Sequence, residues 1–111
     1  MTLEEVRSAV GGTIAVDAPE ASASCAYASD LLSDVMGHSG EGAVLITIQN
    51  HLNTIAVCTL VGTEIIVVCH NRDIPPDMAE AAKREGVAIV TTPLSQFAAS
   101  VALQALPPVE R

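Results

Sequence analysis

The fold is decided by residues 43–91, which read AVLITIQNHLNTIAVCTLVGTEIIVVCHNRDIPPDMAEAAKREGVAIVT. Three continuous apolar runs of strand length recur in this stretch, at 43–48, 64–69 and 87–91, and a helical pattern follows each of them. Strands without hydrophobic alternation are typical of parallel sheets that are buried on both faces. We therefore expect an α/β fold of successive βα units, in which a small, mainly parallel sheet of three or four strands is flanked by helices.

The helices expected after these strands span 50–61, 76–85 and 93–106. In 76–85 the acidic residues come first and the basic residues last, which complements the helix dipole, and Gly86 is expected to end that helix. Thr92 is the expected N-cap of the last helix, with Pro93 at its first position. The apolar face of 50–61 is expected to hold Leu52, Ile55, Ala56 and Leu60. The apolar face of 93–106 is expected to hold Leu94, Phe97, Ala98, Val101 and Ala105.

The amino-terminal part of the chain begins with a helix signature. Thr2 and Glu5 have the spacing of a capping box, which predicts a short helix that reaches about Val10. A short strand is expected at 13–16.

The next segments are patterned less clearly. Residues 21–29, ASASCAYAS, receive no firm assignment, and 28–36 is expected to be a helix that Gly37 ends. The tail at 107–111 is expected to be frayed. The whole chain, 1–111, is expected to form a single domain.

Charge excludes several classes of partner. The chain has 13 acidic and 5 basic residues, a net charge of −8, and no Lys or Arg between Arg7 and Arg72. Nucleic acids and anionic membranes are bound by basic faces, so neither is an expected partner. No run is long enough to span a membrane and the N-terminus lacks the basic start of a signal peptide, so we expect a cytoplasmic protein. The three cysteines, Cys25, Cys58 and Cys69, are odd in number and include no C-x-x-C pair. They are therefore expected to be reduced and packed as small apolar residues.

Polar side chains follow each of the three central strands. The carboxyl ends of parallel strands meet at one edge of a sheet, and ligands of α/β proteins commonly bind there. The candidate ligand-binding residues are Thr47, Gln49, Asn50, His51, His70, Asn71, Arg72, Thr91 and Thr92. Residues of these types also cap helices and form turns, so a structural role is the alternative interpretation for all of them.

Metal binding and catalysis find little support in the sequence. His51, His70 and Cys69 have no recognised ligand spacing, and adjacent Cys69 and His70 would point to opposite faces if strand geometry continued through both, so no metal is expected. Asp30 and Asp34 are four residues apart and are expected to share a solvated helix face. There is no phosphate-binding loop and no nucleophile elbow. We therefore expect no catalytic residue and no cofactor.

Two segments of the chain resemble the DRTGG domain family. They read DLLSDVMGHSGEGAVLITIQNHLNTIAVC (30–58) and GTEIIVVCHNRDIPPDMAEAAKREGVAIVTTPLSQFAASVAL (62–103), and the similarity runs from about Ser24 to Leu106. GTEIIVV and VAIVTTPLSQF match the later part of the family pattern. Residues 47–51, TIQNH, stand where the family carries Asp-Arg-Thr-Gly-Gly, without its Arg and its glycines. The chain is similar to small stand-alone members of the family, often described as HPr-serine-kinase-like.

The resemblance implies an α/β regulatory module. In larger relatives such a domain accompanies catalytic parts, as in CBS-containing pyrophosphatases and phosphotransacetylase-like enzymes, and contributes to dimer contacts. Kinase activity is not expected, because phosphoryl transfer needs a nucleotide cradle, metal-binding acids and a positioned base. The expected function is a non-catalytic regulatory or assembly module that forms a homodimer and acts with a protein partner encoded separately. The alternative is a sensor that binds a small metabolite or nucleotide at the carboxyl ends of the strands.

Overall fold

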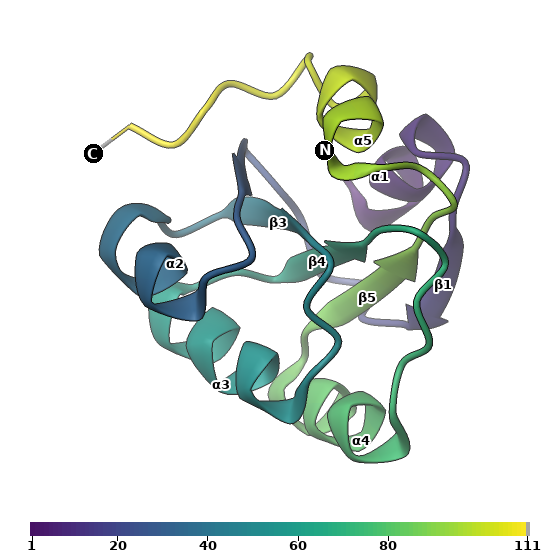
Figure 1. The fold of residues 1–111 in the computed structure, drawn as a ribbon, viewed down its shortest axis with the longest axis vertical. Coiled ribbons are helices and arrows are strands. Elements are labelled where there is room, and N and C mark those ends of the chain that lie inside the picture. The colour runs from purple at the N-terminus through teal and green to yellow at the C-terminus, as the bar shows by residue number, and fades with distance from the viewer. Residues whose placement is uncertain (111) are drawn as a thin grey trace.

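The computed structural model describes residues 1–110 and places one sheet between two layers of helices (Figure 1). Its strands are β1 (Thr13–Val16), β2 (Cys25–Ala28), β3 (Ala43–Thr47), β4 (Ile65–Val68) and β5 (Ala88–Thr91). Its helices are α1 (Leu3–Ala9), α2 (Leu32–His38), α3 (Leu52–Val61), α4 (Pro76–Glu85) and α5 (Gln96–Ala102). Within the described residues, none of these helices is both long enough and apolar enough to cross a membrane.

The strands lie in the order β1-β5-β4-β3-β2. Strands β2 to β5 run parallel to one another, and β1 pairs with β5 in the antiparallel direction. The register places Thr47 beside Val68 and Val68 beside Thr91, so the three central strands end at one edge, which we call the carboxyl edge. The expected α/β fold with a mainly parallel sheet is confirmed. The sheet has five strands in place of three or four, because β2 forms in a segment that received no assignment.

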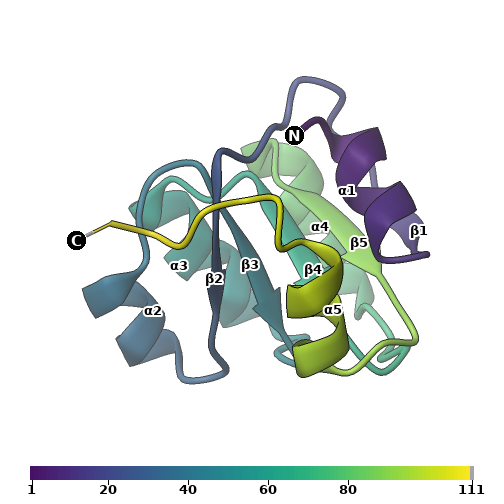
Figure 2. The same cartoon turned by 90° about the horizontal axis from the view of Figure 1, so that it is seen from above.

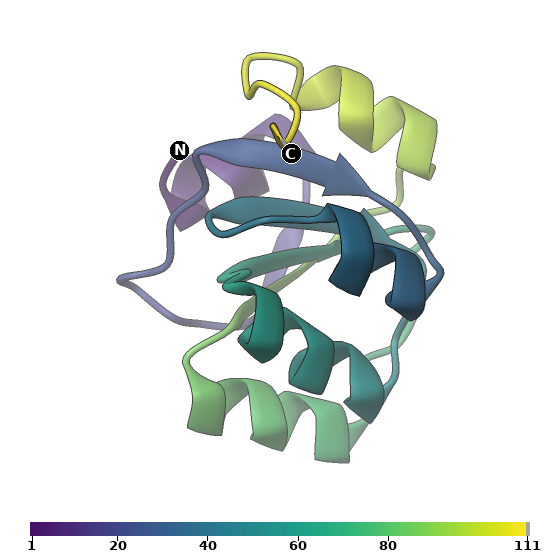
Figure 3. The ribbon, with the colours of Figure 1, turned by 90° about the vertical axis from the view of Figure 1, so that its left-hand side faces the viewer.

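Burial on both faces explains the continuous apolar sequences of the central strands. Every residue of β3 and β4 is buried. Helices α1 and α5 cover the face that holds Val44 and Ile46, and α2, α3 and α4 cover the face that holds Leu45 and Ile66. Figure 2 shows α1 and α5 in front of the sheet, and Figure 3 shows α2, α3 and α4 on its other side. The core clusters on the two faces hold the strands in place, and the strands set the position of the carboxyl edge.

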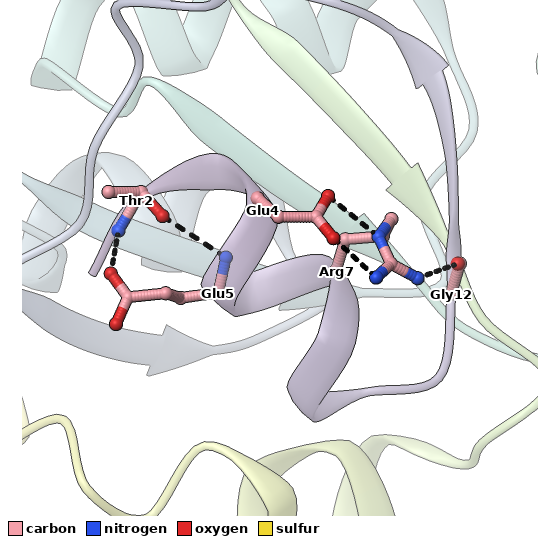
Figure 4. Close-up of polar contacts among 5 residues, drawn as sticks. All are labelled: Thr2, Glu4, Glu5, Arg7 and Gly12. Atoms are coloured by element: carbon pink, nitrogen blue, oxygen red, sulfur yellow. Dashed lines mark hydrogen bonds and ion pairs between the residues drawn. The ribbon is translucent and has the colours of Figure 1, made fainter.

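The capping box expected at the N-terminus is present at the start of α1. The Thr2 side chain accepts a hydrogen bond from the Glu5 N–H at 3.1 Å, and the Glu5 carboxylate accepts one from the Thr2 N–H at 2.9 Å (Figure 4). Arg7 donates to Glu4 and, at 3.4 Å, to the Gly12 carbonyl, which ties α1 to the chain that enters β1. The hydrogen bond from Arg7 holds the pKa of Glu4 below its usual value.

The helix expected at 28–36 begins and ends later than its sequence suggests. Helix α2 spans Leu32–His38, and Gly37 lies inside it. Asp30 belongs to the loop between β2 and α2, whereas Asp34 lies in the first turn of α2. The expectation that Asp30 and Asp34 share a helix face is therefore wrong, because the preceding residues form a strand and delay the start of the helix.

The last helix is shorter than the expected span 93–106. Its N-cap is Ser95, whose side chain accepts from the backbone N–H three residues later at 3.1 Å. The expected N-cap role of Thr92 is wrong. Thr92 is fully buried, and its hydroxyl donates to the Val10 carbonyl at 2.7 Å, which draws the segment before α5 toward α1.

In two helices, the buried residues differ from those expected on the apolar face. In α5, Phe97 and Val101 are exposed to 80% and 47%, and the buried residue is Ala99. In α3, only Ile55 among the residues expected on the apolar face is buried, and Leu60 is 71% exposed. These helices therefore present large apolar side chains to the surroundings of the molecule.

The described part of the tail is paired, contrary to the expectation of fraying. The Ala26 N–H donates to the Pro107 carbonyl at 2.9 Å, and the Val109 N–H donates to the Ala26 carbonyl at 3.3 Å. These bonds lay the tail along the outer side of β2, where the sheet would otherwise end in an unpaired strand. Arg111, the last residue of the predicted tail, lies outside the described residues.

Candidate functional site

A carboxylate that follows β2 organises the carboxyl edge. Asp30 Oδ1 accepts a hydrogen bond from the Thr47 hydroxyl at 3.0 Å and one from the Ile48 N–H at 2.9 Å. The Gln96 side-chain amide donates to the same oxygen at 3.1 Å, and the Gln49 side-chain amide donates to the Asp30 carbonyl at 2.7 Å. The loop after β2, the loop after β3 and the start of α5 are therefore joined through one residue.

Sequence reasoning selected Thr47 and Gln49 but missed both Asp30 and Gln96. Asp30 had a positional signal: it follows CAYA, and recognition of that segment as a strand would have placed Asp30 at the carboxyl edge. Gln96 had no such signal, since it lies 66 residues from Asp30 in the chain.

A second polar group links the loops after β3 and β4. The Asn50 side-chain amide donates to the Asp73 carbonyl at 2.8 Å, and the Arg72 guanidinium donates to Asn50 Oδ1 at 3.3 Å. Arg72 is exposed and Asn50 is half-buried. Two of the candidate residues therefore meet here, with the cation facing solvent.

The loop after β4 has an unusual backbone. His70 and Asn71 have φ angles of 60° and 49°, in the left-handed region that non-glycine residues seldom adopt. The His70 N–H donates to the Leu94 carbonyl at 3.0 Å, and the Asn71 N–H donates to the Thr92 carbonyl at 2.8 Å. Hydrogen bonds donated to carbonyls of the neighbouring loop thus hold the strained conformation, while both side chains remain exposed.

Thr91, the last residue of β5, and Thr92, which follows it, bond to the amino-terminal part of the chain. The Thr92 hydroxyl is bonded to the Val10 carbonyl, as described above. The Thr91 hydroxyl lies 3.5 Å from the Thr13 carbonyl, on the side of β1. The structure therefore brings the candidate residues to one edge of the sheet but divides them into separate groups along it.

His51 is the N-cap residue of α3 and is exposed. It lies beside a hollow of about 280 Å³ between the first turns of α3 and α4. The lining residues are Asn50, His51, Leu52, Asn53, Pro75 and Asp77. The His51 side chain makes no capping hydrogen bond to α3. Backbone N–H groups at such a helix start are available to water or to a ligand.

Two of the thiols are buried, one directly after β4 and one in the second half of α3. Burial, together with the nearby Asp30 charge, raises the pKa of Cys69 to about 11. Burial alone raises the pKa of Cys58, in α3, to about 12. Both thiols are protonated at neutral pH and so are poor nucleophiles. Among residues 1–110, no three His, Cys, Asp or Glu side chains are grouped so that they could hold a metal ion.

A third polar cluster joins β2 to α2. The Tyr27 hydroxyl donates to Asp34 Oδ2 at 2.6 Å, and His38 Nδ1 lies 3.0 Å from Asp34 Oδ1. The hydrogen bond from Tyr27 lowers the pKa of Asp34, and the same bond raises the pKa of Tyr27. This cluster fastens a short helix to its strand.

Comparison with known proteins finds a solved structure with a similar fold. No family model and no curated protein matches the sequence. The chain is similar to the crystal structure of the CBS and DRTGG domains of the regulatory region of Clostridium perfringens pyrophosphatase, complexed with the activator diadenosine tetraphosphate. The TM-score is 0.72 at 16% sequence identity. The fold is DRTGG-like.

The DRTGG-like fold extends over nearly the whole chain. The similarity covers 96% of this chain and 47% of the pyrophosphatase chain, so the protein spans about half the length of that solved structure. The resemblance expected from the sequence is thus confirmed for the fold.

Proposed function

We propose that the protein is a non-catalytic regulatory module that acts as a homodimer. The observation that carries this proposal is that polar side chains at the carboxyl edge form hydrogen bonds with one another. Oδ1 of Asp30 accepts hydrogen bonds from Thr47, Ile48 and Gln96, so this carboxylate holds the edge together. The Cys69 thiol, which lies nearby, is protonated at neutral pH.

The DRTGG-like fold supports the regulatory part of the proposal. The solved structure that shares it belongs to the regulatory region of a pyrophosphatase and also contains CBS domains. A regulatory module acts on another protein, so we propose that this chain works with a partner encoded separately.

Exposed apolar side chains support assembly into a homodimer. A domain of 111 residues buries a limited share of its apolar surface by itself, and a symmetric contact between two copies buries more. Large apolar side chains are between 42% and 80% exposed at Leu31, Met36, Leu52, Leu60, Phe97 and Val101.

Sedimentation equilibrium at micromolar concentrations tests the assembly. We expect a mass twice that of the 11.4 kDa chain. A mass of one chain at every concentration would refute the homodimer.

A second candidate function, binding of a small anionic metabolite or nucleotide, is favoured by the hollow beside His51. Arg72 provides a cation near its rim through its bond to Asn50, and the start of α3 offers backbone N–H groups. Asn71 and His70 add exposed donors from the neighbouring loop.

A thermal-shift screen with nucleotides and central metabolites tests this second function. A ligand at a hundredfold excess over its Kd stabilises the folded state by about 2.7 kcal/mol. We expect a bound ligand to raise Tm in the wild type and in Arg84→Ala, whose changed side chain lies on α4, but much less in Arg72→Ala. The absence of any shift at millimolar ligand would reject the sensor.

A further inference from the structure

Helix α5 carries the most exposed large apolar side chain of residues 1–110. Phe97 is 80% exposed, and Val101, one turn later on the same helix, is 47% exposed. Their exposure is not explained by the core, because Ala99 and Leu103 make the contacts of this segment with the sheet. A phenyl ring that stays in water forgoes the burial of roughly 150–250 Å² that an aromatic side chain gains in a contact.

An apolar groove lies beside this helix. It has a volume of about 220 Å³ and separates α5 from β2. Tyr27 and Ala28 of β2, Ser100 of α5 and Leu106 of the tail are among its lining residues, and none of the lining residues carries a charge at neutral pH. Figure 2 shows α5 in front of the sheet and the tail that follows it passing β2. The groove is therefore suited to an apolar side chain.

The exposed ring and the groove belong to one surface. Ser100, which lines the groove, follows Phe97 by three residues, and residues at this spacing neighbour each other on a helix surface. Val101 extends the same side by one turn. We call this surface, made of Phe97, Ser100, Val101 and the groove, the α5 face.

The α5 face is also free of charge in a strongly acidic chain. No Asp, Glu, Lys or Arg occurs in residues 86–109, although the net charge is −8. Two copies of the chain repel each other over most of their surfaces, and this repulsion is weakest where neither copy brings carboxylates to the contact. At the carboxyl edge, the Asp30 carboxylate is bonded to Gln96 of α5 and to two other donors.

We infer that the α5 face is where two copies of this chain meet, with Phe97 of each copy inserted into the groove of the other. This inference rests on the proposed homodimer and names its contact. A projecting side chain and a receiving groove on one surface are what a two-fold contact requires, since each copy then supplies both halves. A stable dimer buries about 800 Å² per copy, roughly one-seventh of the 5535 Å² surface of one chain.

Sedimentation equilibrium of four proteins tests the contact: the wild type, Phe97→Ser, Gln104→Glu and Leu60→Ser. Gln104 lines the groove, so Gln104→Glu brings a carboxylate to the place where the ring is received. Leu60 is 71% exposed on α3, across the sheet from α5, and serves as the matched control. All three changed residues are exposed, and a far-UV circular dichroism spectrum that matches the wild type confirms that each variant folds. We expect Phe97→Ser and Gln104→Glu to weaken association at least about tenfold, and Leu60→Ser to associate like the wild type.

The other outcomes separate the contact from the assembly. A wild type that dimerises, with Phe97→Ser and Gln104→Glu variants that dimerise equally well, overturns the α5 contact and leaves the proposed homodimer in place. Loss of the dimer in Leu60→Ser alone would move the contact to α3. A wild type that stays monomeric overturns both proposals.

Discussion

Asp30 shows how one side chain can define an edge of a sheet. Its oxygen accepts from Thr47 and Ile48 at the end of β3 and from Gln96 at the start of α5, which lie far apart in the sequence. An ionised carboxylate that accepts several hydrogen bonds holds its donors more firmly than a neutral acceptor does. Its main effect is therefore on the stability and shape of the carboxyl edge.

We predict that Asp30→Ala lowers the free energy of unfolding by about 1–3 kcal/mol, because the half-buried Ile48 N–H and the buried Thr47 hydroxyl lose their acceptor. Urea denaturation measures the change. Glu20→Ala removes an exposed carboxylate and is the control, for which we expect a change within about 0.5 kcal/mol. Equal stability of the two variants would show that the Asp30 bonds contribute little.

The raised thiol pKa values predict selective alkylation. Cys58 and Cys69 are buried, with pKa values of about 12 and about 11, whereas Cys25 is half-buried. We expect an alkylating reagent at mildly alkaline pH to modify Cys25 in the native protein, and the other two only in denaturant. Intact mass before and after denaturation gives the result. Rapid modification of Cys69 in the native protein would contradict its burial.

The same shifts set a direction for stability against pH. The folded thiols of Cys58 and Cys69 keep their protons above the ordinary pKa of 9.0, where unfolded thiols ionise. The unfolded state then binds fewer protons, so stability falls with rising pH. The contribution is fully present below 9.0 and is lost progressively as the pH rises toward the folded values of about 11 and about 12.

At the scale of single elements, the best-predicted parts are those whose sequence reports burial directly. Strands β3, β4 and β5 were predicted within a residue or so, because burial on both faces demands continuous apolar residues. Helix α4 was predicted at its observed bounds from its charge order and Gly86, which adopts a φ of 70° as the helix ends.

The less well-predicted elements depend on their neighbours. Strand β2 consists of CAYA, which is half-buried and exposed at its end, and it gains its place from pairing with β3 on one side and the tail on the other. Because this segment received no assignment, the helix that follows it was predicted too early and Asp30 was not included in the candidate site. For α5, the apolar pattern of 93–106 predicted an inner face, yet Phe97 lies outside. Periodicity marks an apolar stripe but cannot say whether a partner or the core covers it.

Replacing Gly12 or Gly37 by alanine is expected to change the stability of the fold in opposite directions. A Cβ at Gly12 would lie 2.5 Å from the Thr91 carbonyl oxygen and 2.7 Å from Val90 Cγ1, so Gly12→Ala should lower stability by about 1–3 kcal/mol through crowding of β1 against β5. A Cβ at Gly37 meets nothing within 4 Å, and Gly37→Ala should stabilise α2 by about 0.5–1 kcal/mol. Thermal unfolding measures both. A destabilising Gly37→Ala would contradict the helical position of Gly37.

At the scale of the whole molecule, charge and apolar exposure act against each other. The net charge of −8 repels other copies of the chain, while the exposed apolar side chains of the α5 face favour the contact proposed above. We predict that added salt strengthens self-association, because it screens the repulsion and removes no attraction at an uncharged contact. Sedimentation at low and at physiological salt measures this. Weaker association with added salt would indicate ion pairs across the contact.

Small-angle X-ray scattering tests the proposed homodimer most directly. The Cα radius of gyration of a single chain is 11.9 Å, and the size scaling of globular proteins gives about 17 Å for a compact pair of copies. We predict a measured value near the larger figure at micromolar concentrations and above. A value that stays close to that of a single chain at every concentration would contradict the homodimer.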